Sequence, residues 1–154
     1  MKARDIMTKR PITVRPADTL GKVVRILADK KISGCPVVEK GKLVGIVTQT
    51  DVIRTMDVYE KINKGSDMFS LVVAVIKSNE YDNMKVQLKK MLNMKVREFM
   101  EKKVVSIEED DDVYKAAKLI DRHSVDRLPV VKKGKLTGIV TKTDIIKELE
   151  KLEK

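Results

Sequence analysis

The chain has no tryptophan, one cysteine (Cys35) and one histidine (His123) among its 154 residues. A single cysteine excludes an intramolecular disulfide, and one cysteine with one histidine cannot form a zinc cluster. Aromatic residues make up only 3% of the sequence, so a core must be built from Val, Ile, Leu and Met. The longest apolar run, residues 71–76, is far shorter than the ~20 residues that span a membrane. We therefore expect a cytoplasmic protein with no membrane partner and no signal peptide.

Positive charge is in excess and unevenly distributed. The formal net charge is +10, and residues 1–56 carry 12 Lys and Arg against 5 Asp and Glu, whereas residues 96–154 carry 14 against 13. A basic N-terminal half favours an anionic partner such as a nucleotide, a nucleic acid or an acidic protein. Abundant Lys and Glu beside few Asn, Gln and Cys residues is also a pattern reported for thermophiles.

The sequence contains an internal repeat. Residues 3–56 align with residues 96–149 at a constant offset of 93, without a gap and with 19 identities in 54 positions. The longest match sets PVVEKGKLVGIVTQTDVI against PVVKKGKLTGIVTKTDII. The chain is therefore a tandem duplication, which we divide into repeat 1 (1–56), an insert (57–95) and repeat 2 (96–154).

Each repeat predicts the order β-α-β-β-α from its periodicity and turn residues. Asp18 and Asp111 are candidate caps of the first helix, and the Lys-Gly-Lys sequences suit tight hairpin turns. In repeat 1 the predicted elements are an extended run (12–14), a helix after Asp18, two strands (35–39 and 43–48) around a turn (40–42), and a closing helix from about Asp51. In repeat 2 they are an extended run (104–107), a helix after Asp111, two strands (128–132 and 136–141) around a turn (133–135), and a closing helix from about Asp144.

The predicted fold class is α/β (α+β), with the two repeats packed sheet to sheet about a pseudo-twofold axis. One unit of ~55 residues is too small to cover its own sheet, and two copies can share a core. The insert is expected to continue the first closing helix to about Lys64 and to form further elements at 66–76 and 82–94. We interpret the insert as a helical linker on the core or on a second subunit, with a Met-rich binding surface as the alternative.

The end of each repeat resembles a known family. GIVTQTD at 45–51 and GIVTKTD at 138–144, together with the Pro-Val-Val strands and the upstream IMT at 6–8 and FME at 99–101, resemble a pair of CBS domains, also called a Bateman module. One such motif would be weak evidence. Two copies in register within a β-α-β-β-α frame are specific, and the resemblance covers both repeats.

The resemblance implies a regulatory module with no catalytic residue, no cofactor and no metal. Such pairs bind adenosine-containing ligands, namely AMP, ADP, ATP, S-adenosylmethionine or its thioether product, and they usually form a homodimer. The long insert departs from the compact family pattern. We expect no effector domain beside the repeats, so the target protein stays open.

The chemistry of the motif suits a nucleotide. The carboxylates of Asp51 and Asp144 can accept both ribose hydroxyls, and the hydroxyls of Thr48 and Thr141, three residues earlier, can face a phosphate. The amides at the start of a helix add positive potential there. The alternative interpretation is that these residues only cap helices.

The remaining candidate residues surround the two motifs. Arg127 stands where repeat 1 has Gly34, and its guanidinium could clamp a phosphate in the second cleft. A surface ion pair with Asp126 is the alternative. Adenine is expected between apolar strand residues, next to the backbone of Ile12, Thr13, Val14, Cys35, Pro36 and Val37 in the first cleft and of Val105, Ser106, Ile107, Leu128, Pro129 and Val130 in the second.

The sequence also bears on two other functional classes. Non-specific nucleic-acid binding by the basic N-terminal half is the main alternative, although the sequence has no DNA-binding motif and few aromatic residues for base stacking. An enzyme is not expected, because no nucleophile–base set, metal cluster or glycine-rich phosphate loop is present. The acidic run at 108–112 favours a helix start rather than a metal site.

Overall fold

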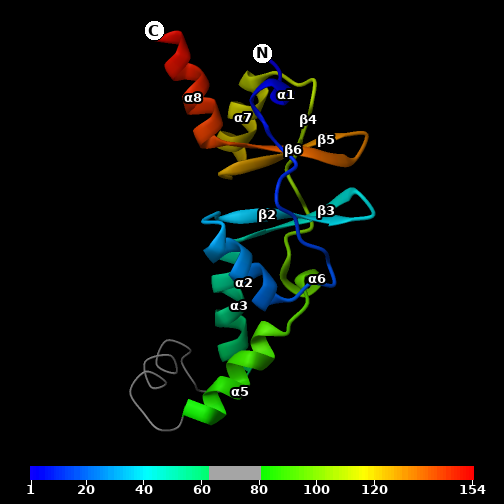
Figure 1. Ribbon diagram of the computed structural model, residues 1–154, viewed down its shortest axis with the longest axis vertical. Helices are drawn as coiled ribbons and strands as arrows, with labels where there is room; N and C mark the ends of the chain where they lie inside the picture. Colours follow the sequence, from blue (N-terminus) through cyan, green and yellow to red (C-terminus); the bar gives the residue numbers. More distant parts are fainter. Residues whose placement is uncertain (63–80) are drawn as a thin grey trace. The chain divides into compact units, whose positions relative to one another are not determined.

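The computed structural model describes residues 1–62 and 81–154 (Figure 1). The architecture is mixed α+β, as predicted, and a short helix opens each repeat. The elements in chain order are α1 (Ala3–Ile6), β1 (Thr8–Lys9), α2 (Leu20–Asp29), β2 (Gly34–Glu39), β3 (Lys42–Thr48), α3 (Gln49–Ile62), α5 (Tyr81–Leu92), α6 (Val96–Phe99), β4 (Ile107–Glu108), α7 (Val113–His123), β5 (Arg127–Lys132), β6 (Lys135–Thr141) and α8 (Lys142–Leu152).

The chain divides into two compact units that interleave along the sequence. Neither unit coincides with one repeat, because β2 and β3 contribute their hairpin tips to one unit and their opposite ends to the other. Unit 1 comprises Met1–Thr13, Pro36–Gly45 and Lys102–Lys154, and unit 2 comprises Val14–Cys35 and Ile46–Glu101.

Unit 1 is built on a mixed sheet. Its strands follow the order β2-β3-β6-β5-β4, and β1 pairs with β6 beside this path. β5 and β6 form an antiparallel hairpin, whereas β4 runs parallel to β5. α7 covers the sheet with Ala116 and Ile120, which are buried against Ile107, Leu128 and Val140. Burial of each large aliphatic side chain contributes roughly 1.5–3 kcal/mol, so this contact fixes α7 on β5.

Both hairpins turn through a Lys-Gly pair, which confirms the tight turns expected from the sequence. Lys40 and Gly41 have φ values of 50° and 79°, and Lys133 and Gly134 have φ values of 51° and 78°. Two consecutive positive φ values define a two-residue type I′ turn, whose twist matches that of the flanking strands.

Unit 2 is largely helical. Leu20 of α2 and Met91 of α5 are buried against each other, and the apolar sides of α3 and α6 pack around them. The helix predicted at 82–94 is therefore confirmed as α5, and its Leu88, Met91 and Leu92 face this core. The predicted element at 66–76 lies outside the described residues.

Two local predictions were wrong. Of residues 12–14 only Val14 makes a β-bridge, and the opening strand of repeat 2 is Ile107–Glu108 rather than 104–107. Pairing explains the difference, because β4 meets its parallel neighbour β5 only at the register Ile107–Val130 and Glu108–Val131.

The helix caps also lie one residue later than predicted. The Thr19 side chain accepts a hydrogen bond from the Lys22 amide at 3.2 Å, and the Asp112 side chain accepts one from the Lys115 amide at 2.7 Å. Asp18 and Asp111 instead close the turn before the cap.

Gly138 allows β1 to lie against β6. Lys9 pairs with Gly138, and a Cβ added at this glycine would lie 2.9 Å from the Thr8 carbonyl oxygen and 2.8 Å from Met7 Cγ. We expect Gly138→Ala to lower the free energy of unfolding by about 1–3 kcal/mol, because β1 must move away. Urea denaturation measures this loss. The exposed α8 variant Lys147→Ala should change stability by less than ~0.5 kcal/mol, and equal stability of the two variants would contradict the close approach.

Candidate functional site

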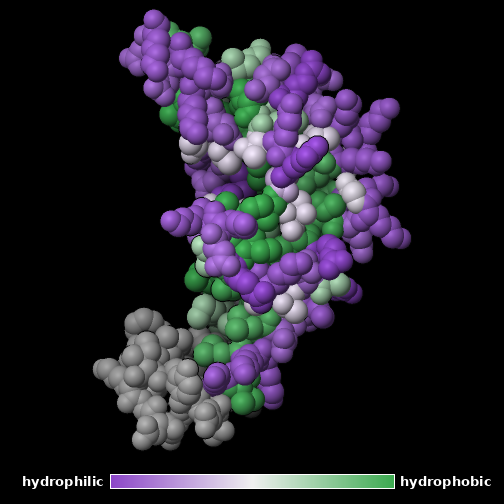
Figure 2. Space-filling model, in the orientation of Figure 1, coloured by the Kyte–Doolittle hydropathy of each residue, from purple (hydrophilic) through white to green (hydrophobic). Residues whose placement is uncertain are grey.

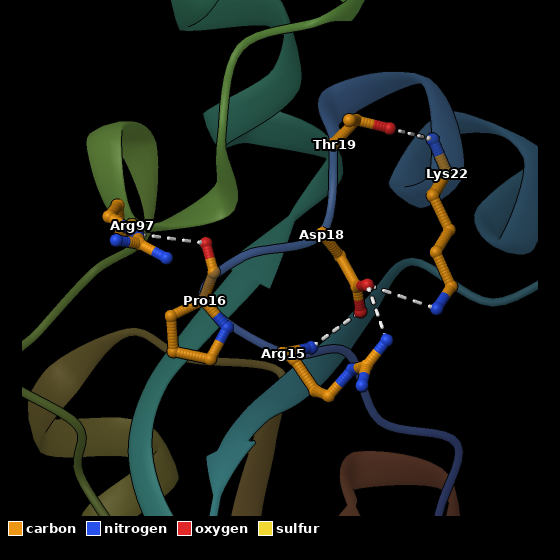
Figure 3. Close-up of polar contacts among 6 residues, drawn as sticks. All are labelled: Arg15, Pro16, Asp18, Thr19, Lys22 and Arg97. Carbon is orange, nitrogen blue, oxygen red and sulfur yellow. Dashed lines mark hydrogen bonds and ion pairs between the residues drawn. The ribbon is translucent and has the colours of Figure 1, made fainter.

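The turn before α2 holds the opening helix of the other repeat. The Val96 amide of α6 donates to the Asp18 carbonyl oxygen at 2.8 Å, and the Arg97 amide donates to the Pro16 carbonyl oxygen at 3.1 Å. Arg97 and Pro16 face each other in Figure 3, and Arg97 Nε also donates to this oxygen, at 3.4 Å. Repeat 2 therefore begins on a turn of repeat 1, and both partners lie in unit 2.

The same contact recurs in unit 1 with the repeats reversed. The Ala3 amide of α1 donates to the Asp111 carbonyl oxygen at 2.8 Å, and the Arg4 amide donates to the Glu109 carbonyl oxygen at 3.1 Å. The two repeats thus exchange their opening helices. Sequence reasoning missed this exchange, because the alignment of the repeats shows which segments are equivalent but not which ones touch.

A buried carboxylate organises the turn of unit 2. The Asp18 side chain is only 8% exposed, and it accepts from the Arg15 amide at 2.7 Å and pairs with Lys22 Nζ at 3.2 Å (Figure 3). Burial alone would raise the pKa of Asp18. The hydrogen bonds from the Arg15 amide and from Lys22, with the charges of Lys22 and Arg15, outweigh burial and hold this pKa below its ordinary value.

The matching carboxylate in unit 1 is Asp111, which accepts from the Glu108 amide at 3.0 Å and from Lys115 Nζ at 2.8 Å. The hydrogen bond from Lys115 is the largest influence on Asp111 and lowers its pKa. Both turns therefore depend on an ionised carboxylate at equivalent positions of the two repeats.

The Thr-x-x-Asp motifs have nearly identical geometry in the two repeats. Asp51 Oδ2 accepts from the Thr48 amide at 2.8 Å and from Thr48 Oγ1 at 3.0 Å, while the Asp51 amide donates to Thr48 Oγ1 at 3.4 Å. The corresponding distances for Thr141 and Asp144 are 2.8, 2.9 and 3.3 Å. Each pair is a reciprocal cap of the helix that follows.

This cap uses one carboxylate oxygen and the hydroxyl proton. Oδ1 of each aspartate is outside the reciprocal cap, and in Asp51 it faces Arg54 Nη1 at 3.6 Å. A hydroxyl has a single proton, so Thr48 or Thr141 could donate to a phosphate only by giving up its bond to the aspartate. The geometry thus combines the two interpretations, since the aspartates are caps and keep an acceptor oxygen outside the cap.

Asp51 borders a hollow of about 200 Å³ in unit 2. α3 and α6 form its walls, so the hollow joins the closing helix of repeat 1 to the opening helix of repeat 2. Sequence reasoning missed its other lining residues, although Arg54 could have been suspected because it follows Asp51 by one helical turn. The lining residues are Asp51, Arg54, Thr55, Met94, Glu98 and Phe99.

In unit 1 the fold brings the predicted polar residues of the second cleft together. Arg127 lies directly opposite Thr141 in the β5–β6 ladder, and Thr141 caps α8 with Asp144. Asp126, which sequence reasoning considered as a partner of Arg127, pairs with Lys142 Nζ at 2.9 Å. The hydrogen bond and charge of Lys142, with the charge of Arg127, lower the pKa of Asp126.

The predicted apolar residues are mostly core residues. Leu128, Pro129 and Val130 are buried on β5, whereas Val105 and Ser106 lie before β4 and are partly exposed. The first set is divided, with Ile12, Thr13, Pro36 and Val37 in unit 1 and Val14, Cys35, Thr48 and Asp51 in unit 2.

The doubled motif and the mixed α+β fold define a tandem pair of small domains, and the chain belongs to the CBS-domain family. The family model for the CBS domain matches residues 3–58 and 96–151. The protein MJ1426 of Methanocaldococcus jannaschii is 38% identical, over 97% of this chain and 91% of its own length. The chain spans 39% and 45% of the length of two further curated relatives.

Solved structures have the same fold. A crystal structure of CBSX2 in complex with AMP matches with a TM-score of 0.73 and 22% identity, covering 99% of this chain and 98% of that one. The CBS domain pair of protein MJ0100, in complex with 5-methylthioadenosine and S-adenosylmethionine, matches with a TM-score of 0.68 and 25% identity over 100% and 98% of the two chains.

Across residues 1–62 and 81–154, no group of three or more His, Cys, Asp or Glu side chains could share a metal ion. The helices in this same part of the chain are all too short or too polar to cross a membrane.

We expect the Asp18 carboxylate to make stability depend on pH. Its pKa is lower in the folded chain than in the unfolded one (about 3.9), so its contribution is present above pH ~4–5 and disappears as pH falls through the folded value. Asp18→Asn should lower the free energy of unfolding by about 1–3 kcal/mol at pH 7 and by much less near pH 2. Urea denaturation across this pH range measures the difference.

Thr19→Ala is the matched control, because it removes the neighbouring cap but no titrating group. Its cost of about 1 kcal/mol should be the same at every pH. A pH-independent loss in Asp18→Asn as well would contradict the role given to the carboxylate.

Proposed function

We propose that this protein is a non-catalytic regulatory module that binds adenosine-containing ligands at its two Thr-x-x-Asp junctions. The observation that carries the proposal is the junction itself. Both repeats hold an aspartate at the start of a helix with the same cap and with Oδ1 left outside it. Such an oxygen can accept hydrogen bonds from ribose hydroxyls while the cap stays intact.

We assign the parts of the ligand as follows. Asp51 and Asp144 would bind ribose, and Arg127, which lies opposite Thr141, would bind a phosphate at the second site. The backbone of the strand and pre-strand residues that flank each junction would contact adenine. At the first site, the Arg54 and Phe99 side chains in the hollow beside Asp51 offer a cation and an aromatic ring.

The related structures support this class of ligand. One of them contains AMP, and another contains S-adenosylmethionine with 5-methylthioadenosine. The adenosine portion is common to all three compounds, whereas the phosphate is not. We therefore propose recognition through the ribose and adenine, with the phosphate contact deciding among ligands.

Binding would signal through a conformational shift. The hollow beside Asp51 is walled by α3 and α6, and α6 is hydrogen-bonded to the turn at 16–18. A ligand that contacts both helices would favour one arrangement of the opening helix of repeat 2, by no more than its difference in affinity between the two arrangements. We propose that a target protein in the cytoplasm reads this change.

Two equivalent apolar grooves could form the interface of a homodimer. The groove between α7 and α8 measures about 420 Å³, and the groove between α2 and α3 measures about 370 Å³. Ile146 and Ile53 occupy the same position in the two grooves and are 63% and 64% exposed. We propose that a second copy of the chain covers these side chains.

We expect adenosine ligands at about 100 times their Kd to raise Tm by roughly 5–10 °C, because they bind only the folded chain. Asp51→Ala combined with Asp144→Ala should abolish this increase for AMP, ADP, ATP, S-adenosylmethionine and 5-methylthioadenosine. Thermal denaturation with each compound, on protein freed of bound nucleotide, is the measurement.

Asp112→Ala separates ligand binding from capping, because Asp112 caps α7 outside the motif. The substitution should lower the free energy of unfolding by about 0.5–2 kcal/mol, and therefore lower Tm without ligand. The ligand-induced increase in Tm should stay intact.

Arg127→Ala should weaken the binding of AMP more than the binding of 5-methylthioadenosine, which has no phosphate. No stabilisation of the original chain by any of the five compounds would refute the proposed function.

We expect Ile53→Lys with Ile146→Lys to convert a dimer into a monomer, because it places charges on the proposed interface. Sedimentation equilibrium measures the mass. Val86→Lys with Tyr114→Lys adds the same charge at side chains that are 53% and 74% exposed, and it should leave the dimer intact. A monomer in the original chain would remove the homodimer from the proposal.

A further inference from the structure

The two Lys-Gly turns lie side by side in unit 1. The Leu43 amide donates to the Gly134 carbonyl oxygen at 3.3 Å, and the Leu136 amide donates to the Gly41 carbonyl oxygen at 3.3 Å. These reciprocal bonds join the start of β3 to the start of β6 and set Lys42 opposite Lys135. Turns that are 93 residues apart in the sequence are therefore neighbours, and both hairpin tips lie at the right in Figure 1.

This twin-turn surface concentrates positive charge. Its four lysines are all exposed, and in the described part of the chain no carboxylate lies within 4.0 Å of their ammonium groups. The face shown in Figure 2 is hydrophilic at the right, where the hairpin tips lie. The four residues are Lys40, Lys42, Lys133 and Lys135.

The pairing of Lys42 with Lys135 is unfavourable for folding. The bonds at Leu43 and Leu136 flank the pair, so Lys42 and Lys135 form a non-hydrogen-bonded pair, the closer of the two antiparallel kinds, with Cα atoms about 4.5 Å apart. Like charges directly opposite each other destabilise a sheet. The fold therefore maintains this charge at a cost.

The turn positions of Lys40 and Lys133 are also unfavourable for lysine. Their φ values of 50° and 51° lie in the left-handed region, where a type I′ turn prefers Asn, Asp or Gly. Neither the turn nor the sheet favours lysine at these positions, yet both repeats have it. The charge is best explained by a role outside the hairpins.

β1 adds two cations to the same edge of β6. Lys9 pairs with Gly138, three residues beyond Lys135, and Arg10 follows on the side toward the turns. Both residues are exposed. The basic surface therefore extends along the strand edge for roughly 10 Å, at about 3.4 Å per residue, and spans more than one phosphate of a nucleic-acid strand.

We propose that the twin-turn surface, with Lys9 and Arg10, binds the phosphate backbone of nucleic acid without sequence preference. Lysines on flexible stems suit phosphates, and the six residues of the two turns include no aromatic side chain for stacking on bases and no apolar one for insertion into a lipid surface. The surface draws on both repeats, so it differs from the basic N-terminal half expected from the sequence. It is also separate from the Thr-x-x-Asp junctions.

Fluorescence anisotropy with a labelled single-stranded DNA of mixed sequence, about 20 nucleotides long, tests the proposal on the full chain. Affinity should fall steeply as salt rises from roughly 50 to 300 mM, with a log–log slope of about −0.7 per phosphate contact. Replacing all four turn lysines by Gln should weaken binding at low salt by about 10–100-fold and make the slope shallower by up to about 3.

Lys40→Asn with Lys133→Asn guards against misfolding, because Asn suits the first position of a type I′ turn. This variant should keep or raise Tm and still weaken DNA binding several-fold. The control replaces Lys30, Lys89, Lys90 and Lys147 by Gln, which removes the same charge from exposed positions in helices or, for Lys30, at a helix end. It should retain most of the affinity.

Three outcomes would overturn the proposal. They are equal losses in the turn and control variants, no DNA binding by the original chain, and binding to phosphatidylserine vesicles in place of DNA. Stabilisation by AMP should be unchanged in the turn variants, so failure here is distinguishable from failure of the proposed function.

Discussion

Backbone hydrogen bonds at two equivalent turns hold the exchanged helices of this protein. In each turn two backbone carbonyl oxygens accept hydrogen bonds from the amides of a four-residue helix of the other repeat. These oxygens belong to Pro16 and Asp18 in one turn and to Glu109 and Asp111 in the other. A helix of this length is not stable alone, so α1 and α6 exist because the turns hold them. The ionised Asp18 and Asp111 close these turns. Through the turns, these two charges help to hold a helix of the other repeat in each unit.

At each Thr-x-x-Asp junction, the two oxygens of one carboxylate have different environments. One carboxylate oxygen caps the helix, and the other lies outside the cap, so in the proposed function one side chain serves both stability and ligand recognition. The cap would hold the proposed ribose acceptor in place before a ligand binds, which would lower the entropy lost on binding. It also means that loss of the aspartate affects the helix and the site together, and only a separate cap such as Asp112 distinguishes the two effects.

The carboxylates of the two turns before α2 and α7 stabilise the fold, whereas the lysines at the two hairpin tips repel one another. Asp18 and Asp111 lie beside basic partners that keep them ionised, whereas the lysines of the two turns lie opposite or beside one another on an exposed edge. Repulsion there is weak because water and salt screen exposed charges, and the sheet tolerates it. The carboxylates that stabilise the turns are therefore at least partly buried and are paired, whereas the lysines available to a partner are exposed and clustered.

The sequence by itself determined the duplication, the α-β-β-α order that completes each repeat, the hairpin turns and the positions of the two motifs, because these depend on local periodicity and on residues with special backbone preferences. The sequence did not determine which single residue caps a helix. The caps are Thr19 and Asp112, one residue later than predicted, because neighbouring polar residues can each fill this role. Only the tertiary structure decided that the repeats exchange their opening helices, that Arg127 faces Thr141, that Phe99 approaches Asp51 and that Lys42 lies opposite Lys135. These contacts join residues distant in the chain, and their partners are selected by the packing of the whole fold, which no local pattern encodes.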